Sequence, residues 1–263
     1  MNSAAFLVLL FSIFVSALAA PQPEPHQGIP EDPEPVTTVT SCGGLLETTS
    51  AIINFQVGGS IRADMRCLWI VNAPYDTQRF SLVSSGLNEN DGLFVTAYGK
   101  EGPGLQYKVA SLGQNHTFVS RTVLVTLNVG HAPTFGFSLK FFSSGSAGAV
   151  AITGYIGLTT ARGNLSYPLG GGNYQNSESA LITITPTVPG KPTLRFTFVD
   201  MEGASCLYDY VRTFTWFENT YSQVARFCGT TIPTSLTLAE GVGLVSFTSD
   251  ASVTGPGFAF EWE

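Results

Sequence analysis

The side chains best suited to chemistry lie in one run, residues 198–211, and in a short segment downstream of it. The run contains Asp200 and Glu202 in a loop between two strand-like segments, and Asp209 follows after a cysteine. Asp250 stands further on, within the sequence Ser-Asp-Ala-Ser. Carboxylate oxygens are the ligands that a hard cation such as calcium takes. Carboxylates that converge without a cation repel one another and raise one another's pKa.

The elements that must position these acids are short β-strands. The chain has 28 glycines and 15 prolines, and 44% of its residues are hydrophobic against 12% that are charged. This composition is typical of a folded protein with many strands and turns. One β-rich segment, residues 193–199, enters the acidic run and another leaves it. We therefore predict an all-β fold.

The chain begins with a segment typical of secretion signals. Residues 4–15 are apolar apart from Ser12, and small residues at 17 and 19 precede a cleavage point, although no Lys or Arg comes first. We predict a signal peptide over residues 1–20 and a disordered tail, rich in Pro and Glu, over residues 21–40. No later segment is apolar for long enough to span a bilayer. We expect a secreted, extracellular protein.

Two folded units follow, and they share one order of motifs. The first is predicted over residues 41–143 and the second over residues 150–263, with a short linker of Ser, Gly and Ala between them. Three positions correspond across the units: Leu181 with Trp69, Ser179 with Cys67, and Asp209 with Asp91. The shared order indicates a duplication within the chain.

The chain contains four cysteines, which in an exported protein are expected to form two disulfides. Sequence alone allows three pairings. The simplest is local, Cys42 with Cys67 and Cys206 with Cys228. Each such bond closes a loop of roughly 25 residues and would stabilise the fold by about 3–3.5 kcal/mol. Neither a Cys-x-x-Cys redox motif nor a close pair suited to zinc is present.

Polar motifs elsewhere indicate a glycoprotein without enzymatic activity. Sequons at Asn115 and Asn164 predict surface glycosylation. The three histidines, His26, His116 and His131, lie in the tail, in the first sequon and in a loop, and none has a catalytic signature beside it. No nucleophile elbow, zinc-binding His pair or phosphate loop occurs. The net charge is −7 and no basic stripe is present, which excludes nucleic acid as a partner.

Taken together, the motifs resemble those of the CUB domain, a secreted β-sandwich module used mainly for protein–protein contacts. In the second unit they are a loop cysteine, Tyr-Asp, Cys-Gly, Ser-Asp-x-Ser and Gly-Phe, at 206, 208–209, 228–229, 249–252 and 257–258. In the first they are Cys-Gly-Gly, Cys-x-Trp-Ile and Gly-Phe, at 42–44, 67–70 and 136–137. The resemblance implies two jelly-roll-like CUB sandwiches in tandem.

The resemblance also implies how each unit departs from the family. A full CUB domain has two disulfides, one near its start and one before its Tyr-Asp motif. The first unit keeps only the early bond, Cys42–Cys67, and the second keeps only the later one, Cys206–Cys228. Both units are therefore degenerate, and core packing must replace the missing cross-link in each.

Many CUB domains hold a calcium ion, and the family's ligands fall here on Glu202, Asp209 and Asp250. The resemblance thus implies one Ca²⁺ site in the second unit. Tyr174 resembles the tyrosine that hydrogen-bonds a ligand carboxylate, with Tyr167 as the alternative. The spacing from Glu202 to Asp209 is one residue shorter than in the family, so a loop deletion and a role for Asp200 both stay open.

The first unit lacks this set of acids. Asp91 is retained, but residues 129–132 contain no acid where the second aspartate belongs. Glu89 and Asp64 are displaced from the ligand positions. We predict no ion in the first unit.

The leading functional hypothesis is an extracellular, non-enzymatic protein-binding protein. In the family, the ligand acids of the calcium site often receive a Lys or Arg side chain of the partner. Tyr208, Tyr210 and Trp216 are either contact residues beside that site or part of the sandwich core. The alternatives are a carbohydrate- or matrix-binding protein and a purely structural secreted protein.

Overall fold

The structure is a computed structural model, which describes residues 36–148, 152–203 and 205–263. The predicted signal peptide and most of the predicted tail lie outside these residues. All 19 secondary-structure elements of the described residues are β-strands, so the predicted all-β fold class is confirmed. Within the same residues, no helical segment has the length and hydropathy needed to cross a bilayer.

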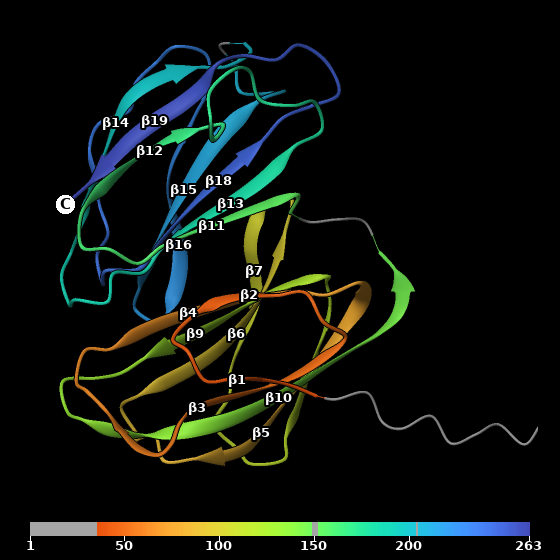
Figure 1. Cartoon of the computed structure of the whole chain (residues 1–263), viewed down its shortest axis with the longest axis vertical. Helices are drawn as coiled ribbons and strands as arrows, with labels where there is room; N and C mark the ends of the chain where they lie inside the picture. The colour runs from red at the N-terminus through yellow and green to blue at the C-terminus, as the bar shows by residue number, and fades with distance from the viewer. Residues whose placement is uncertain (1–35, 149–151, 204) are drawn as a thin grey trace, which may run out of the picture. The chain divides into compact units, whose positions relative to one another are not determined.

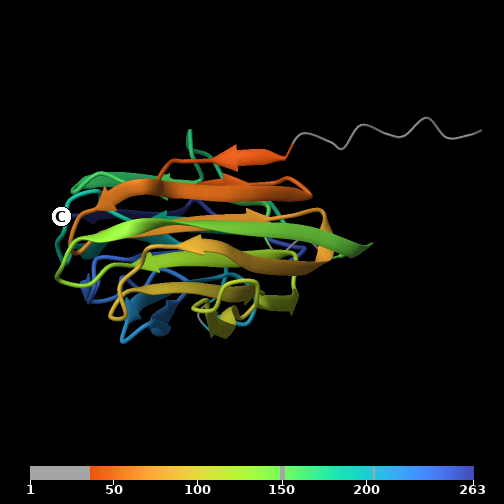
Figure 2. The same ribbon diagram turned by 90° about the horizontal axis from the view of Figure 1, so that it is seen from below.

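Residues 37–147 form two five-stranded sheets. The first has the strand order β1-β3-β10-β5-β8, and the second has the order β2-β4-β9-β6-β7. Figure 2 shows the first sheet across its face, with orange β3, green β10 and gold β5 side by side. The bounds are β1 Thr37–Val39, β2 Gly44–Leu46, β3 Ser50–Ile61, β4 Arg66–Asn72, β5 Tyr75–Ser85, β6 Gly92–Gly99, β7 Gly102–Lys108, β8 Asn115–Val119, β9 Thr122–Asn128 and β10 Thr134–Ala147.

Residues 154–262 form two further sheets (Figure 1). Their strand orders are β11-β13-β18-β15-β16 and β12-β19-β14-β17. The bounds are β11 Gly154–Leu158, β12 Gly163–Tyr167, β13 Ser179–Ile184, β14 Thr193–Asp200, β15 Tyr210–Phe217, β16 Thr220–Phe227, β17 Leu236–Thr237, β18 Gly243–Thr248 and β19 Gly257–Trp262.

The sheets of the two halves repeat one topology. In the sheet β2-β4-β9-β6-β7 the first pair is parallel and the other pairs are antiparallel. The sheet β11-β13-β18-β15-β16 has the same sequence of parallel and antiparallel pairs. The repeated order agrees with an internal duplication, whereas the domain limits at 41–143 and 150–263 stay predictions.

The register of these two sheets shows that the matches predicted from the sequence, Leu181 with Trp69 and Ser179 with Cys67, are wrong by one residue. Asn128 pairs with Arg66 and Gly92, and Thr248 pairs with Ser179 and Tyr210. The true counterparts are therefore Ser179 with Arg66, Ala180 with Cys67 and Ile182 with Trp69. Burial agrees, because Trp69 and Ile182 belong to the cores of their own halves while Leu181 belongs to a different cluster. A shift of one residue moves a strand side chain to the opposite face.

Strand β4 shows why the middle sheets are apolar on both faces. Its burial pattern is nearly continuous instead of alternating. Cys67, Trp69 and Val71 point into the core of the first half. Leu68 and Ile70 belong instead to a cluster shared with the second half. Strands that are covered on both faces read as unbroken hydrophobic runs.

This shared cluster draws on the same strand positions in both halves. From the first half it contains Leu68, Ile70, Phe94, Tyr98 and Leu124, and from the second Leu181, Phe214, Trp216, Val242 and Leu244, with Ile152. Tyr98 and Trp216 are counterparts in the corrected register, as are Leu124 and Leu244. The sheets therefore use equivalent faces, as two subunits do in a two-fold dimer interface.

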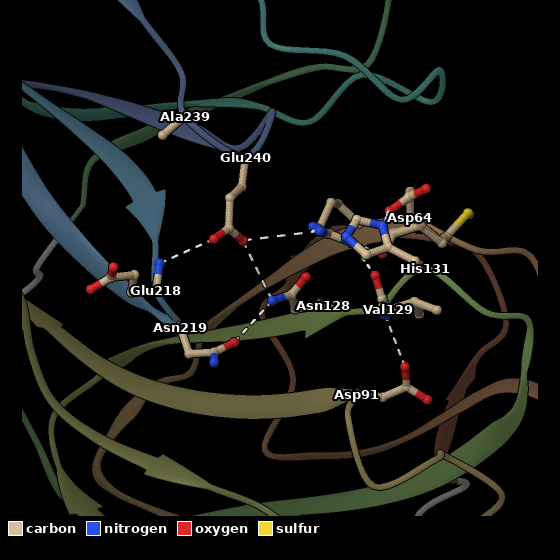
Figure 3. A network of polar contacts seen from close by, with 12 residues as sticks. Asp64, Asp91, Asn128, Val129, His131, Glu218, Asn219, Ala239 and Glu240 are labelled. Carbon is tan, nitrogen blue, oxygen red and sulfur yellow. Dashed lines mark hydrogen bonds and ion pairs between the residues drawn. The ribbon is translucent and has the colours of Figure 1, made fainter.

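Polar contacts complete the packing around this cluster. Tyr98 Oη donates to Ser246 Oγ at 2.7 Å, and both side chains are buried. At another place Glu240 accepts a hydrogen bond of 3.0 Å from the backbone N–H of Glu218 (Figure 3). The same carboxylate lies 3.5 Å from Asn128 Nδ2 and 4.0 Å from Arg66 Nη2.

Strands extend a few residues past two of the predicted limits, which themselves stay predictions. The tail was expected to reach residue 40, but Thr37–Val39 form β1 and pair in parallel with β3. Their β-branched side chains favour a strand. The first unit was expected to end at residue 143, but β10 continues through the Ser- and Gly-rich segment to Ala147. Pairing with β5 holds this segment, and Gln78 donates to the buried Ser143 side chain.

Candidate functional site

The three acids predicted as calcium ligands lie together at one end of the second half. Glu202 follows β14, Asp209 directly precedes β15, and Asp250 follows β18. One carboxylate oxygen from each lies within 4.8 Å of the others. Asp209 is fully buried, while Glu202 and Asp250 are half-buried. Asp200, which the short spacing had left as an alternative, does not belong to this group.

Tyr174 forms hydrogen bonds to two of these acidic residues. Its hydroxyl donates a short hydrogen bond to Asp209 Oδ2 and accepts one of 3.1 Å from the backbone N–H of Glu202. Burial and the hydrogen bond to Asp209 raise the pKa of Tyr174, so it stays a donor. Asp209 Oδ1 accepts a further bond of 2.8 Å from the backbone N–H of Asp250. Tyr167 donates instead to Glu178, and within the described residues it forms no hydrogen bond to the three acids.

The loop that carries Glu202 and Asp209 is held at its base. The disulfide Cys206–Cys228 joins it to the segment after β16. The backbone N–H of Met201 donates to Gly229 O at 2.9 Å. Gly203 has φ +67°, a left-handed conformation that glycine adopts at little cost. These constraints fix the loop whose two acids must converge.

No Lys or Arg among the described residues forms an ion pair with the three acids. Burial raises the pKa of Glu202, and the carboxylates of Asp250 and Asp209 raise it further. Glu202 Oε2 is buried and has no hydrogen-bond partner in the described part of the chain. A buried oxygen without a partner is costly, and the donor set consists of hard oxygens. The arrangement therefore suits a small divalent cation such as calcium.

The matching position in the first half is built differently. Asp91 is buried, and its Oδ1 accepts from the backbone N–H of Gly130 at 2.9 Å. Its Oδ2 accepts from the backbone N–H of Asn88 at 2.7 Å. Gly130 stands where the second half has Asp250, so the buried aspartate keeps its backbone contact but has no acid beside it. Asp64 pairs instead with the exposed His131 at 2.8 Å (Figure 3).

The structure places the remaining predicted site residues as follows. Disulfides join Cys42 to Cys67 and Cys206 to Cys228. Asn115 on β8 and Asn164 on β12 are both exposed, as an attached glycan requires. Of the three aromatic residues considered as contacts, Tyr208 is 51% exposed, while Tyr210 and Trp216 are buried.

Two arginines beside the acids were not anticipated from the sequence. Arg212 on β15 and Arg226 on β16 lie directly opposite each other in the sheet. Both guanidinium groups contact the ring of Tyr210. Neither residue lies in a recognisable motif. Their proximity depends on the β15–β16 register, and only an alternating pattern of basic residues in two adjacent strands could have hinted at it.

Comparisons with known proteins agree with this architecture. Residues 154–262 match the family model described as CUB domain. The chain is 25% identical to "Cubilin" of Canis lupus familiaris over 236 residues, which are 85% of this chain and 6% of that protein. It is 30% identical to "Tolloid-like protein 1" of Homo sapiens over 107 residues, 40% of this chain and 11% of that protein. The chain thus spans a small part of either relative.

Among solved structures, the chain resembles "CUB1-EGF-CUB2 domains of rat MASP-1". The two share 15% sequence identity with a TM-score of 0.37, and the match covers 84% of this chain and 99% of that one.

Proposed function

We propose that residues 154–262, which match the CUB domain model, bind one Ca²⁺ through Glu202, Asp209 and Asp250, and that the loops so ordered bind an extracellular protein. The observation that carries the proposal is the convergence of three carboxylate oxygens, from the β14–β15 loop and the segment after β18, within 4.8 Å of one another.

The residues present fit a calcium ion. The three acids supply negative charge, and the backbone N–H and tyrosine donors hold the carboxylate of Asp209 in one orientation. Glu202 Oε2 has no other partner among the described residues. When bound, the ion would neutralise the mutual repulsion of these acids and join the loops after β14 and β18.

The surroundings of the acids support a protein as the ligand. Leu207 and Tyr208 precede Asp209, and Val253 follows Asp250. All three side chains are exposed, by 71%, 51% and 61%. Exposed apolar and aromatic residues beside a charged group are typical of the anchors of a protein interface. A Lys or Arg of the partner would approach the acids, and these side chains would contact its stem.

The metal-binding step is tested by calcium-dependent melting of the full secreted chain. An ion that binds only the folded state stabilises it, by about 2.7 kcal/mol at one hundred times the dissociation constant. We expect calcium to raise the melting temperature of the native chain and of the control Glu89→Gln, which changes an exposed acid of the first half. Asp250→Asn should lose most of this increase. An equal increase in Asp250→Asn would refute the site.

The binding step is tested by capture from extracellular fluid, with and without a calcium chelator. Calcium-dependent capture that Asp250→Ala abolishes supports the proposal. Capture that survives both changes means that the acids do not mediate it. Binding to a glycan array without calcium would favour the carbohydrate-binding alternative instead.

A further inference from the structure

A pocket of about 240 Å³ borders the acidic site. Asp250 and Leu207 line it, together with Tyr210 and Arg212 of β15 and Arg226 of β16. Lys100, from the turn between β6 and β7, completes its basic side. The pocket therefore combines three cationic side chains with one wall of the acidic group, in a chain whose net charge is −7.

Arg212 and Arg226 both contact the ring of Tyr210. The guanidinium carbon of Arg212 lies 4.7 Å from the centroid of Tyr210, and that of Arg226 lies 4.2 Å from it. Cross-strand neighbours with like charge destabilise a sheet. The ring attracts both cations but carries no net charge. A neighbouring anion would reduce the repulsion between the two arginines.

One carboxylate is already present, but it pairs with only one of the arginines. Arg212 is 3% exposed, donates to Glu101 Oε2 at 2.5 Å and to Lys100 O at 3.1 Å, and carries a buried Nε without a partner. The exposed Arg226 donates to the carbonyl of Cys206 and forms no ion pair among the described residues. A guanidinium has five N–H donors, so Arg226 retains donors for an external acceptor.

We propose that this pocket binds a carboxylate side chain of the protein partner, with Arg226 as its main contact. The proposal rests on the proposed function only in taking the ligand to be a protein. The Glu101–Arg212 pair shows that the pocket accommodates a planar carboxylate against a guanidinium. Leu207 offers apolar contact to the stem of an acidic side chain, and Asp250 disfavours polyanions such as sulfated glycans.

The consequence is a partner with a defined charge pattern. The acidic group accepts a cation of the partner, and the arginine pocket beside it accepts an anion. The two share Asp250 as a common wall. A partner segment with one basic and one acidic side chain close together would satisfy both, whereas a segment of one charge only would satisfy one and be repelled by the other.

The test uses the full ¹⁵N-labelled chain and N-acetylglutamate methylamide as the probe, followed by NMR. We expect saturable shifts at the amides of residues 207–212 and 226, and none with the neutral N-acetylglutamine methylamide. Arg226→Gln should weaken probe binding at least about tenfold, since hydrogen bonds to charged groups are among the stronger ones. Arg226→Lys should retain part of it. The control Arg79→Gln, an exposed arginine on β5, should bind as the native chain does.

Three results would overturn the inference: equal shifts with the neutral probe, unchanged binding by Arg226→Gln, or shifts spread over the surface. Inorganic sulfate binding at these amides as strongly as the carboxylate probe would also overturn the assignment to an acidic side chain. Repeating the titration in calcium and in calcium-free buffer separates the two proposals. Probe binding without calcium-induced stabilisation refutes only the calcium site, and the reverse outcome refutes only the arginine pocket.

Discussion

Gly154 and Ala180 occupy the place of a disulfide that the second half lacks, and restoring this bond is a direct test of the register. The two residues pair in the parallel ladder of β11 and β13. In the first half, Cys67 is the counterpart of Ala180, and its disulfide partner Cys42 lies two residues before β2, where an extension of the β2–β4 ladder would reach the counterpart of Gly154. A Cβ atom built on Gly154 lies 3.9 Å from that of Ala180. This separation falls within the range of native disulfides.

We therefore expect the double variant Gly154→Cys, Ala180→Cys to form a disulfide. The loop it closes is similar to the one closed by Cys42–Cys67, whose separation is 25 residues. In the chain-entropy model a loop of this length corresponds to about 3.5 kcal/mol. If the two halves unfold together, as a folded region of roughly 150–250 residues, that gain would raise the melting temperature by about 7–14 °C. Replacing Gly154 also lowers the conformational entropy of the unfolded chain, which stabilises the folded state further.

The assay compares this variant with Gly154→Ser, Ala180→Ser, which has side chains of similar size and no cross-link. Thiol titration and peptide mapping establish whether the new bond forms without disturbing Cys206–Cys228. Non-reducing denaturation in urea then measures the free energy of unfolding. Two free thiols under oxidising conditions, or a stability equal to that of the Ser variant, would refute the one-residue correction. In the uncorrected alignment Ser179 would be the bridging position, so Ser179→Cys with Gly154→Cys should not cross-link.

Three further predictions follow from the interface and the acidic site. Tyr98→Phe should lower the free energy of unfolding by about 1 kcal/mol at neutral pH, because buried Ser246 loses its hydrogen bond. Burial raises the pKa of Tyr98 to about 12, so the stability that the Tyr98 hydroxyl provides should be lost from the native chain as the pH rises above 10, and Tyr98→Phe should not show this loss in pH-dependent melts. Without calcium, protonated Glu202 stabilises the folded state below its ordinary pKa of 4.5, and this stabilisation is lost as the pH rises through its raised pKa. Calcium binds the deprotonated carboxylates, so calcium-induced stabilisation in melts should grow over the same pH interval and vanish in acid. Residues 150–263 expressed alone should self-associate in light scattering, because Trp216 and its neighbours lose their cover; a stable monomer would show that the shared cluster is dispensable.

The fold class and the proximity of the three acids could both be anticipated from the sequence. Strand composition and turn residues are local properties, and the acids lie in motifs whose order resembles that of a known family. The register of β13 could not be anticipated. Leu181 and Ile182 are both buried aliphatic residues in a strand covered on two faces, so the usual alternation gives no sign of which one points into its own core.

For a related reason, the sequence did not reveal that strands extend past the predicted limits of the tail and the linker. Low complexity between residues 143 and 149 predicted a flexible connection, yet Gly145 and its neighbours follow the path of β10 along β5. Small residues permit flexibility but do not require it when a neighbouring strand offers unpaired N–H and C=O groups. Tertiary pairing decided the outcome, and no window of the sequence contains that information.

The corrected register also explains why the two halves have diverged at equivalent positions. Arg212 is the counterpart of Phe94, one on each side of the shared cluster. Phe94 packs against Trp216 within the cluster, with ring centroids 5.2 Å apart. Arg212 is buried as well, but its guanidinium forms an ion pair with Glu101, which lies in the β6–β7 turn of the first half. A strictly symmetric interface would bury two apolar residues here. The asymmetry leaves one end of the interface as a charged pocket next to the acidic group, and this pocket is the one proposed to bind an acidic side chain of the partner.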